Sequence, residues 1–147
     1  MSTTVVAVPS DRLRTGLAIL RIVVGIVFAA HGAQKLFVFG LAGVTAGFAQ
    51  MGIPLPGISA PLVALVEFLG GIALIIGLLT RLAAVGLAID MLGAIMLVHL
   101  KGGFFMPSGV EFALTLLAAC IAIAVGGPGA FAVDDEIAKR RGAAVRV

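Results

Sequence analysis

The chain has 147 residues, of which 61% are hydrophobic and only 12% are charged. A soluble domain averages about 45–50% apolar residues, so this composition excludes an ordinary water-soluble fold and predicts a protein surrounded by membrane lipid. The formal net charge is +3, but the basic residues stand at the ends of apolar runs rather than in one patch, which argues against nucleic acid as a partner.

Four long apolar runs follow one another along the chain. Each has about 20 residues, the length that a helix needs to cross a bilayer, and only a helix satisfies its own backbone groups in lipid. We therefore predict an all-α membrane protein, a bundle of four transmembrane helices. A less apolar segment after the first run, Leu41–Met51, predicts a short helix lying over the outer mouth of the bundle. The four runs are Thr15–Phe39, Ser59–Leu79, Leu82–Leu100 and Val110–Gly127.

The boundaries between the runs define the expected domain organisation. Residues 1–14 form an N-terminal tail, residues 15–127 the transmembrane domain and residues 128–147 a C-terminal tail. The tight turn Thr80-Arg81 makes the second and third runs antiparallel neighbours. In the C-terminal tail, the acidic residues 134–136 precede the basic residues 139–141, an order that favours a short solvated helix.

The placement of Lys and Arg predicts how the bundle sits in the membrane, because basic residues accumulate on the cytoplasmic side. Lys35 and Lys101 fall on one side, and Arg21 lies within the first run. Both termini are therefore expected in the cytoplasm. An alternative interpretation treats the first run as a cleavable signal peptide, although its length and Arg21 argue against that. The residues on the side of the termini are Arg12, Arg14, Arg81, Lys139, Arg140, Arg141 and Arg146.

Ionisable side chains inside a spanning helix are costly and should find partners within the bundle. Counted from the cytoplasmic ends of their runs, Arg21 and Asp90 lie at similar depths. We expect them to form a structural ion pair that sets the register of the helices. A role for the two residues in a proton or charge relay is the alternative.

A second polar cluster is expected in the outer half of the bundle. His31 and Lys35 are one helical turn apart, and Glu67 lies at a similar depth in the second run. Lys35 would hold the carboxylate of Glu67 ionised, and Glu67 could hydrogen-bond the imidazole of His31. Gly70 and Gly71 share the face of Glu67 and would let a neighbouring helix or a flat ligand approach closely. The cluster is either a structural polar lock or a binding or redox site.

Three further features complete the set of candidate residues. His99 lies at the outer end of the third run, about 180° from Asp90 on a straight helix. Haem ligation by the two histidines, or a zinc or copper site of His31, Glu67 and His99, remains a weak alternative, so no metal site is assigned. Cys120 is the single cysteine, so an intramolecular disulfide is impossible. The candidate cofactor-binding residues are Gln34, Gly70, Gly71 and His99.

Several short motifs occur along the chain in a characteristic combination. They are Leu20-Arg21-Ile22-Val23, His31-Gly32-Ala33-Gln34-Lys35-Leu36, Glu67-Phe68-Leu69-Gly70-Gly71, Gly77-Leu78-Leu79-Thr80-Arg81, Gly102-Gly103-Phe104-Phe105 and Gly127-Pro128-Gly129. Together they resemble the DoxX family of bacterial membrane proteins, over about residues 13–134. The resemblance implies a four-helix inner-membrane protein linked to quinone-coupled oxidation of thiosulfate, to resistance against reactive quinones and catechols, and to oxidative-stress complexes.

Residues and resemblance together predict a membrane-bound oxidoreductase component that binds a quinone-like ligand in the outer half of the bundle. In this hypothesis His31 and Lys35 hydrogen-bond or protonate a quinone oxygen, and Glu67 orients His31 and relays protons. One alternative is a non-enzymatic scaffold that recruits soluble redox enzymes. A second alternative, small-solute transport, needs a polar path for which only Arg21 and Asp90 offer side chains in the inner half.

Overall fold

The computed structural model describes residues 10–144, and this part of the chain is helical and contains no strand. Residues 1–9 of the predicted N-terminal tail and residues 145–147 of the predicted C-terminal tail lie outside the described part. The helices are α1 (Asp11–Ala33), α2 (Gly40–Gln50), α3 (Pro56–Ile76), α4 (Thr80–Ala94), α5 (Glu111–Gly126) and α6 (Val133–Ala144). A π-helical segment, Gln34–Phe39, follows α1; a second, Ile95–His99, follows α4 and leads into a 3₁₀ turn, Leu100–Gly102.

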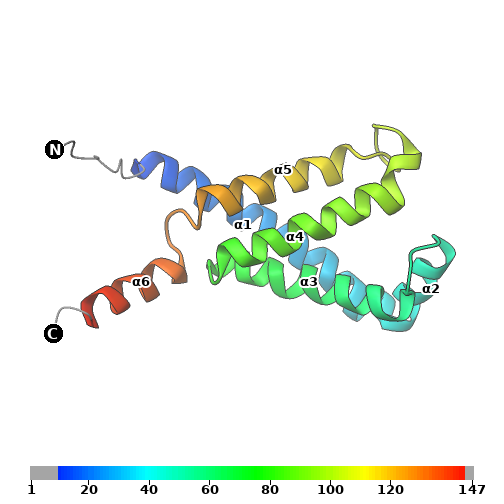
Figure 1. Ribbon diagram of the computed structural model, residues 1–147, viewed down its shortest axis with the longest axis horizontal. Helices are drawn as coiled ribbons and strands as arrows, with labels where there is room; N and C mark the ends of the chain where they lie inside the picture. Colours follow the sequence, from blue (N-terminus) through cyan, green and yellow to red (C-terminus); the bar gives the residue numbers. More distant parts are fainter. Residues whose placement is uncertain (1–9, 145–147) are drawn as a thin grey trace, which may run out of the picture.

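Helices α1, α3, α4 and α5 form the bundle, with α2 at one end and α6 at the other (Figure 1). Helix α3 packs most extensively on α1, and α4 packs most extensively on α5. We refer to the two ends as the α2 end and the α6 end. The short helix predicted at Leu41–Met51 is confirmed as α2, which Gly40 separates from the preceding segment by its positive φ of 68°.

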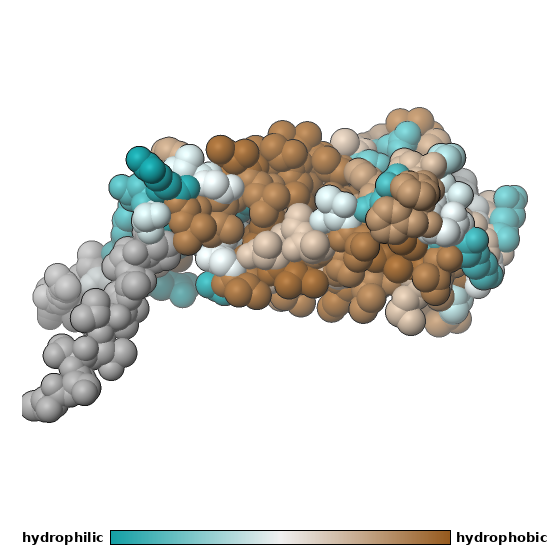
Figure 2. Space-filling view, turned by 90° about the horizontal axis from the view of Figure 1, so that it is seen from above, coloured by the Kyte–Doolittle hydropathy of each residue, from teal (hydrophilic) through white to brown (hydrophobic). Residues whose placement is uncertain are grey.

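Three helical segments are long and apolar enough to cross a membrane: Asp11–Gln50, Pro56–Ile76 and Thr80–Gly102. Helix α5 is also apolar, but its 16 residues measure about 24 Å, slightly less than a bilayer core of about 30 Å. An apolar surface covers the middle of the molecule, with polar residues gathered toward the ends (Figure 2). The all-helical membrane fold is therefore confirmed, whereas the fourth span and the cytoplasmic termini stay predictions.

Glycines bring the backbones of α1 and α3 into direct contact. A Cβ added to Gly32 would meet the backbone of Phe68, and one added to Gly71 would meet the backbone of Ala29. Close approach of this kind is the usual role of small residues between membrane helices, where dispersion contacts replace the hydrophobic effect. Gly71 is therefore used for packing against α1.

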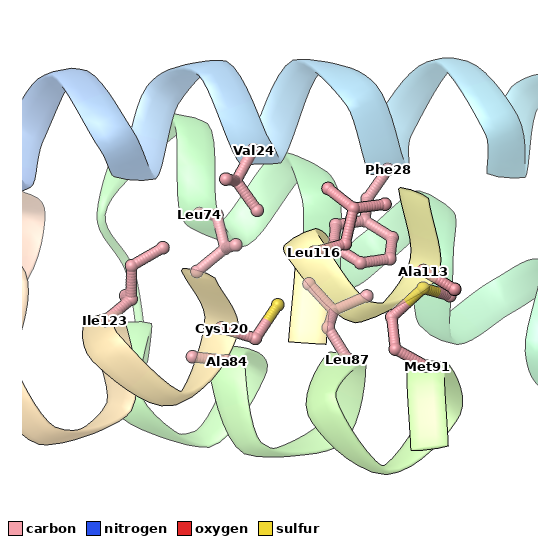
Figure 3. Close-up of a cluster of buried hydrophobic side chains, with 10 residues drawn as sticks. All are labelled: Val24, Phe28, Leu74, Ala84, Leu87, Met91, Ala113, Leu116, Cys120 and Ile123. Atoms are coloured by element: carbon pink, nitrogen blue, oxygen red, sulfur yellow. The ribbon is translucent and has the colours of Figure 1, made fainter. Parts of the chain in front are cut away.

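An apolar core joins the four long helices. Phe28 of α1 and Leu87 of α4 are fully buried, and the thiol of Cys120 lies among them (Figure 3). Because these side chains fill the centre of the bundle, they fix the distances between its helices. The core consists of Val24, Phe28, Leu74, Ala84, Leu87, Met91, Ala113, Leu116, Cys120 and Ile123.

Arg21 closes the α6 end of the bundle. Its fully buried guanidinium donates hydrogen bonds to the carbonyls of Leu74 and Ile75 near the end of α3, the latter at 3.0 Å. It also donates to the carbonyls of Ala130 and Phe131, at 3.2 and 3.3 Å. The last carbonyls of a helix lack intrahelical partners, so Arg21 satisfies the end of α3 and ties the chain before α6 to α1.

The expected ion pair of Arg21 with Asp90 is therefore not formed. The charges near Arg21 are those of Asp134 and Asp135, whereas those near Asp90 are Lys35 and Glu67. Equal depth along two helices does not ensure contact, because rotation about each axis decides where a side chain points. The guanidinium of Arg21 is turned toward the α6 end, away from the carboxyl group of Asp90.

The predicted C-terminal helix is confirmed as α6, and its first turn is anchored to the bundle. The carboxylate of Asp134 accepts hydrogen bonds from the backbone N–H groups of Leu79, at 2.7 Å, and Thr80, at 2.8 Å. Burial alone raises the pKa of Asp134, but the hydrogen bonds from Thr80 and Leu79 and the charge of Arg21 outweigh it and hold the pKa below its ordinary value. An ion pair between Arg14 and Asp135 adds a second anchor.

Candidate functional site

A cavity of about 530 Å³ lies in the half of the bundle nearer α2. This volume falls within the range of small-molecule sites. Its walls come from the four long helices and from Phe48 of α2, and its floor includes core residues such as Phe28. Most lining side chains are apolar. The ionisable side chains in the lining are His31, Lys35, Glu67, Asp90 and His99.

Lys35 and Glu67 form an ion pair in the wall of this cavity. The side chain of Glu67 is only 5% exposed and that of Lys35 is 21% exposed. Lys35 belongs to the π-helical segment Gln34–Phe39, a type of insertion that is frequent at functional sites because it re-aims side chains. The structure therefore contains the Lys35–Glu67 contact that depth along the helices predicts.

Asp90 adds a second carboxyl group to the pair. It lines the same cavity, and Glu67 and Lys35 are its charged neighbours. Its Oδ2 atom is buried and has no hydrogen-bond partner among the described residues. Sequence reasoning assigned Asp90 to Arg21 and so missed it here. Gly86 and Gly93 recur with Asp90 at intervals of four and three residues, so the sequence already places the three residues on one face of α4.

His31 stands at the edge of the site. Its Nδ1 donates a hydrogen bond to the carbonyl of Val27 at 2.9 Å, and its ring lies 6.0 Å from that of Phe112, measured between centroids. A neutral imidazole in this tautomer presents Nε2 as an acceptor. The expected hydrogen bond between His31 and Glu67 is not formed, because the ring is held by its own helix.

His99 lines the cavity together with Asp90, although a straight helix would place the two on opposite faces. The π-helical segment Ile95–His99 lies between them and changes the angular register of α4. The Nδ1 atom of His99 lies 3.3 Å from the carbonyl oxygen of Ser108. Within residues 10–144, no three His, Cys, Asp or Glu side chains come together in a group that could hold a metal ion.

The other candidate cofactor-binding residues lie outside the cavity lining. Gln34 is exposed. A Cβ on Gly70 would contact the side chain of Leu87 at 3.2 Å, and Gly71 faces α1. Both glycines therefore border neighbouring helices rather than open space. The structure brings together Lys35, Glu67 and Asp90, with the two histidines around them.

The DoxX family profile matches residues 16–100, more than half of the chain. The chain belongs to the DoxX family. Three DoxX-like relatives cover most of its length. A Bacillus subtilis protein named "Putative oxidoreductase CatD" is 35% identical over 84% of this chain and 88% of its own length. An uncharacterised membrane protein of Mycobacterium tuberculosis is 36% identical over 82% of this chain and 80% of its own. The Escherichia coli inner membrane protein YqjF is 33% identical over 85% and 94%.

The names of these relatives agree with the apolar helices of the bundle, and this DoxX protein is a multi-pass inner membrane protein. No solved structure matches the chain significantly.

Proposed function

We propose that this DoxX-family protein is a membrane-embedded oxidoreductase component whose cavity binds a quinone-like ligand. The observation that carries the proposal is the Lys35–Glu67 pair, joined by Asp90, in the wall of a largely apolar cavity of about 530 Å³. Large apolar pockets with a few convergent polar groups are the usual form of a ligand site. The relative named as an oxidoreductase supports the reaction class.

The residues present fit such a ligand. A quinone head group is a flat apolar ring with carbonyl oxygens, so it needs apolar walls and a small number of hydrogen-bond donors. Phe28, Met91 and Leu116 supply apolar walls, and the ammonium group of Lys35 supplies donors. Asp90 can donate to a carbonyl oxygen when it carries a proton, and its Oδ2 has no other partner among the described residues.

Each polar residue has a distinct role in this proposal. Lys35 binds a ligand oxygen, and Glu67 holds the ammonium group in place. Asp90 holds or releases a proton beside Glu67, and the more exposed His31 exchanges protons with the surroundings. A quinone, when bound, supplies two-electron, two-proton chemistry. In this proposal a soluble redox partner supplies the electrons.

A binding experiment tests the proposal. The purified protein in nanodiscs would be titrated with a quinone, with binding followed by calorimetry. We expect Glu67→Gln to weaken binding at least tenfold, because Lys35 loses its carboxylate, and Lys35→Met to weaken it further. Lys101→Met, an exposed lysine outside the cavity lining, is the matched control and should bind as the wild type does. Unchanged affinity in folded E67Q and K35M proteins would contradict the proposal.

One observation favours the alternative of a non-enzymatic scaffold. Helix α6 extends away from the bundle beyond its first turn (Figure 1), and Lys139, Arg140 and Arg141 are exposed on it. Replacing these three residues with serine would remove the charges and keep the anchoring residue Asp134. Loss of cellular function in this variant, with Glu67→Gln silent, would favour the scaffold. Transport gains no support, since the apolar core fills the bundle between the cavity and Arg21.

A further inference from the structure

The cavity lies where helices α3 and α4 face one another. Val63 and Val66 line it from α3, and Gly86 and Gly93 line it from α4. A Cβ on Gly93 would meet no atom within 4 Å, and a Cβ on Gly86 would meet only Val66, at 3.9 Å. The two helices therefore leave open space at Gly93 and are only in ordinary contact distance at Gly86, in contrast to α1 and α3, whose backbones touch.

The packing of the bundle explains this separation. Helices α3 and α4 meet at the turn Gly77–Leu79 and diverge toward the α2 end (Figure 1). Each packs more extensively on its other neighbour, α3 on α1 and α4 on α5. The bundle therefore consists of two tightly packed helix pairs with a looser seam between them.

The outer edge of this seam is apolar and faces away from the bundle. Leu62, Ile89 and Leu97 line the cavity, yet they are 58%, 66% and 46% exposed. A side chain can do both only where the cavity reaches the molecular surface. These residues belong to helices long and apolar enough to cross a membrane, so the surface that they border faces lipid.

The cavity is also longer than a quinone ring alone requires. Gly93 is three residues from Asp90 and Leu97 is seven, so the lining along α4 extends about 10 Å beyond the carboxyl groups. Nonpolar side chains line most of this extension, and His99 lies at its far end. A single ring held at Lys35 and Glu67 leaves it unfilled, whereas a flexible hydrocarbon chain matches its shape and polarity.

We propose that the cavity opens sideways into the bilayer between α3 and α4, and that this lateral opening holds the hydrocarbon tail of the ligand. This inference rests on the proposed function and narrows its substrate class. The ligand is a membrane-dissolved amphiphile with a polar ring at Lys35, Glu67 and Asp90 and a long apolar tail that passes Gly93 into lipid. A tail-less, water-soluble quinone would use only the inner part of the site.

Gly93→Phe tests the opening, because a phenyl group there extends into the space that the tail would occupy. Gly16→Phe is the matched control: a Cβ on Gly16 of α1 also meets no atom within 4 Å, and Gly16 lies outside the cavity lining. The probes are two quinones with the same ring, one with a long isoprenoid tail and one without a tail, titrated into nanodisc-embedded protein. Gly93→Leu provides a second variant if the phenylalanine impairs folding.

We expect G93F to weaken binding of the tailed quinone at least tenfold and to leave the tail-less quinone within twofold of wild type, with G16F changing neither. Equal effects of G93F on both probes, or no effect on either, would overturn the lateral opening while the proposed function stands. If the wild-type protein binds neither probe, the proposed function fails and this inference fails with it.

Discussion

Three cationic side chains of the bundle are paired in two different ways. Arg21 donates to carbonyl oxygens at the end of α3, and the exposed Arg81 does the same at the end of α5, through the carbonyls of Ala124 and Val125. Lys35 instead pairs with a carboxylate. The planar guanidinium can bridge several carbonyls at once, whereas an ammonium group acts as a single charge. The arginines therefore fit structural ties, and the lysine fits a site in which a ligand can share its donors.

Removing the cation from the polar site should be more harmful than removing one carboxylate. We predict that Lys35→Met lowers the free energy of unfolding by about 3 kcal/mol, because Glu67 and Asp90 are left without a counter-charge. Glu67→Gln should cost less, since Asp90 remains near Lys35. Denaturant unfolding in mixed micelles measures both.

The double variant K35M/E67Q provides the control for this prediction. It removes one charge of each sign, so it should be more stable than K35M alone, and the exposed Lys101→Met should change stability by less than about 0.5 kcal/mol. A double variant less stable than K35M would contradict the assignment of the pair.

At the scale of the helices, glycine position separates packing from open space. Gly71 holds α3 against α1, whereas Gly93 borders the cavity. Two π-helical segments, Gln34–Phe39 and Ile95–His99, follow α1 and α4, and each carries an ionisable residue that lines the cavity. The helices are therefore shaped around the site by a few local deviations from regular α-helix.

The close contact between α1 and α3 predicts that one added methyl group strongly lowers the stability of the protein. Gly71→Ala should destabilise the protein by about 1–3 kcal/mol, because the new Cβ meets the backbone of Ala29, which cannot move aside cheaply. Gly16→Ala adds a Cβ in open space and should be neutral or stabilising by up to about 1 kcal/mol. Thermal unfolding of both variants measures the difference, and equal melting temperatures would contradict the close contact.

The hydrogen bonds between Asp134 and the start of α4 predict that the stability of the protein depends on pH. Because the pKa of Asp134 is lower in the folded protein, its contribution to stability is present above the pKa of the unfolded chain, about 3.9, and is lost as the pH falls through the folded value. Asp134→Asn should cost about 1 kcal/mol at neutral pH. The difference from wild type should shrink below about pH 4, as followed by thermal unfolding. Glu136→Gln, an exposed control, should show no such loss.

At the scale of the whole molecule, the two ends of the bundle are built differently. The α6 end is closed by hydrogen bonds from Arg21 and to Asp134. The α2 half contains the cavity and the diverging helices α3 and α4. The hydrogen bonds at the α6 end hold the helices in fixed positions, and this rigidity keeps the cavity in the α2 half in a shape that can accept a ligand.

This division predicts a difference between two truncations. Ending the chain after Pro128 removes the carbonyls of Ala130 and Phe131, to which Arg21 donates, and the carboxylate at the start of α4, so it should lower the melting temperature by several degrees. Ending it after Ala138 keeps these contacts and should leave the melting temperature within about 2 °C. Calorimetry in detergent compares the two, and equal melting temperatures would show that the contacts before residue 138 add no stability.

Sequence reasoning reached most of the fold and part of the site. The apolar composition predicted a membrane protein. The four apolar runs correspond to α1, α3, α4 and α5 within a few residues when the π-helical segments that follow α1 and α4 are included. Depth along the helices also predicted that Lys35 meets Glu67. These properties depend on the length, hydropathy and rise of each helix, which the order of residues determines directly.

Only the tertiary structure decided which side chains contact one another or line the same cavity. It turned Arg21 toward the carbonyls at the α6 end and Asp90 toward Glu67, and it placed Gly71 against α1. It also brought His99 to the cavity of Asp90 through the π-helical segment before it. The physical reason is that sequence sets the depth of a residue along its helix, whereas packing and local changes of helical pitch set its rotation about the axis.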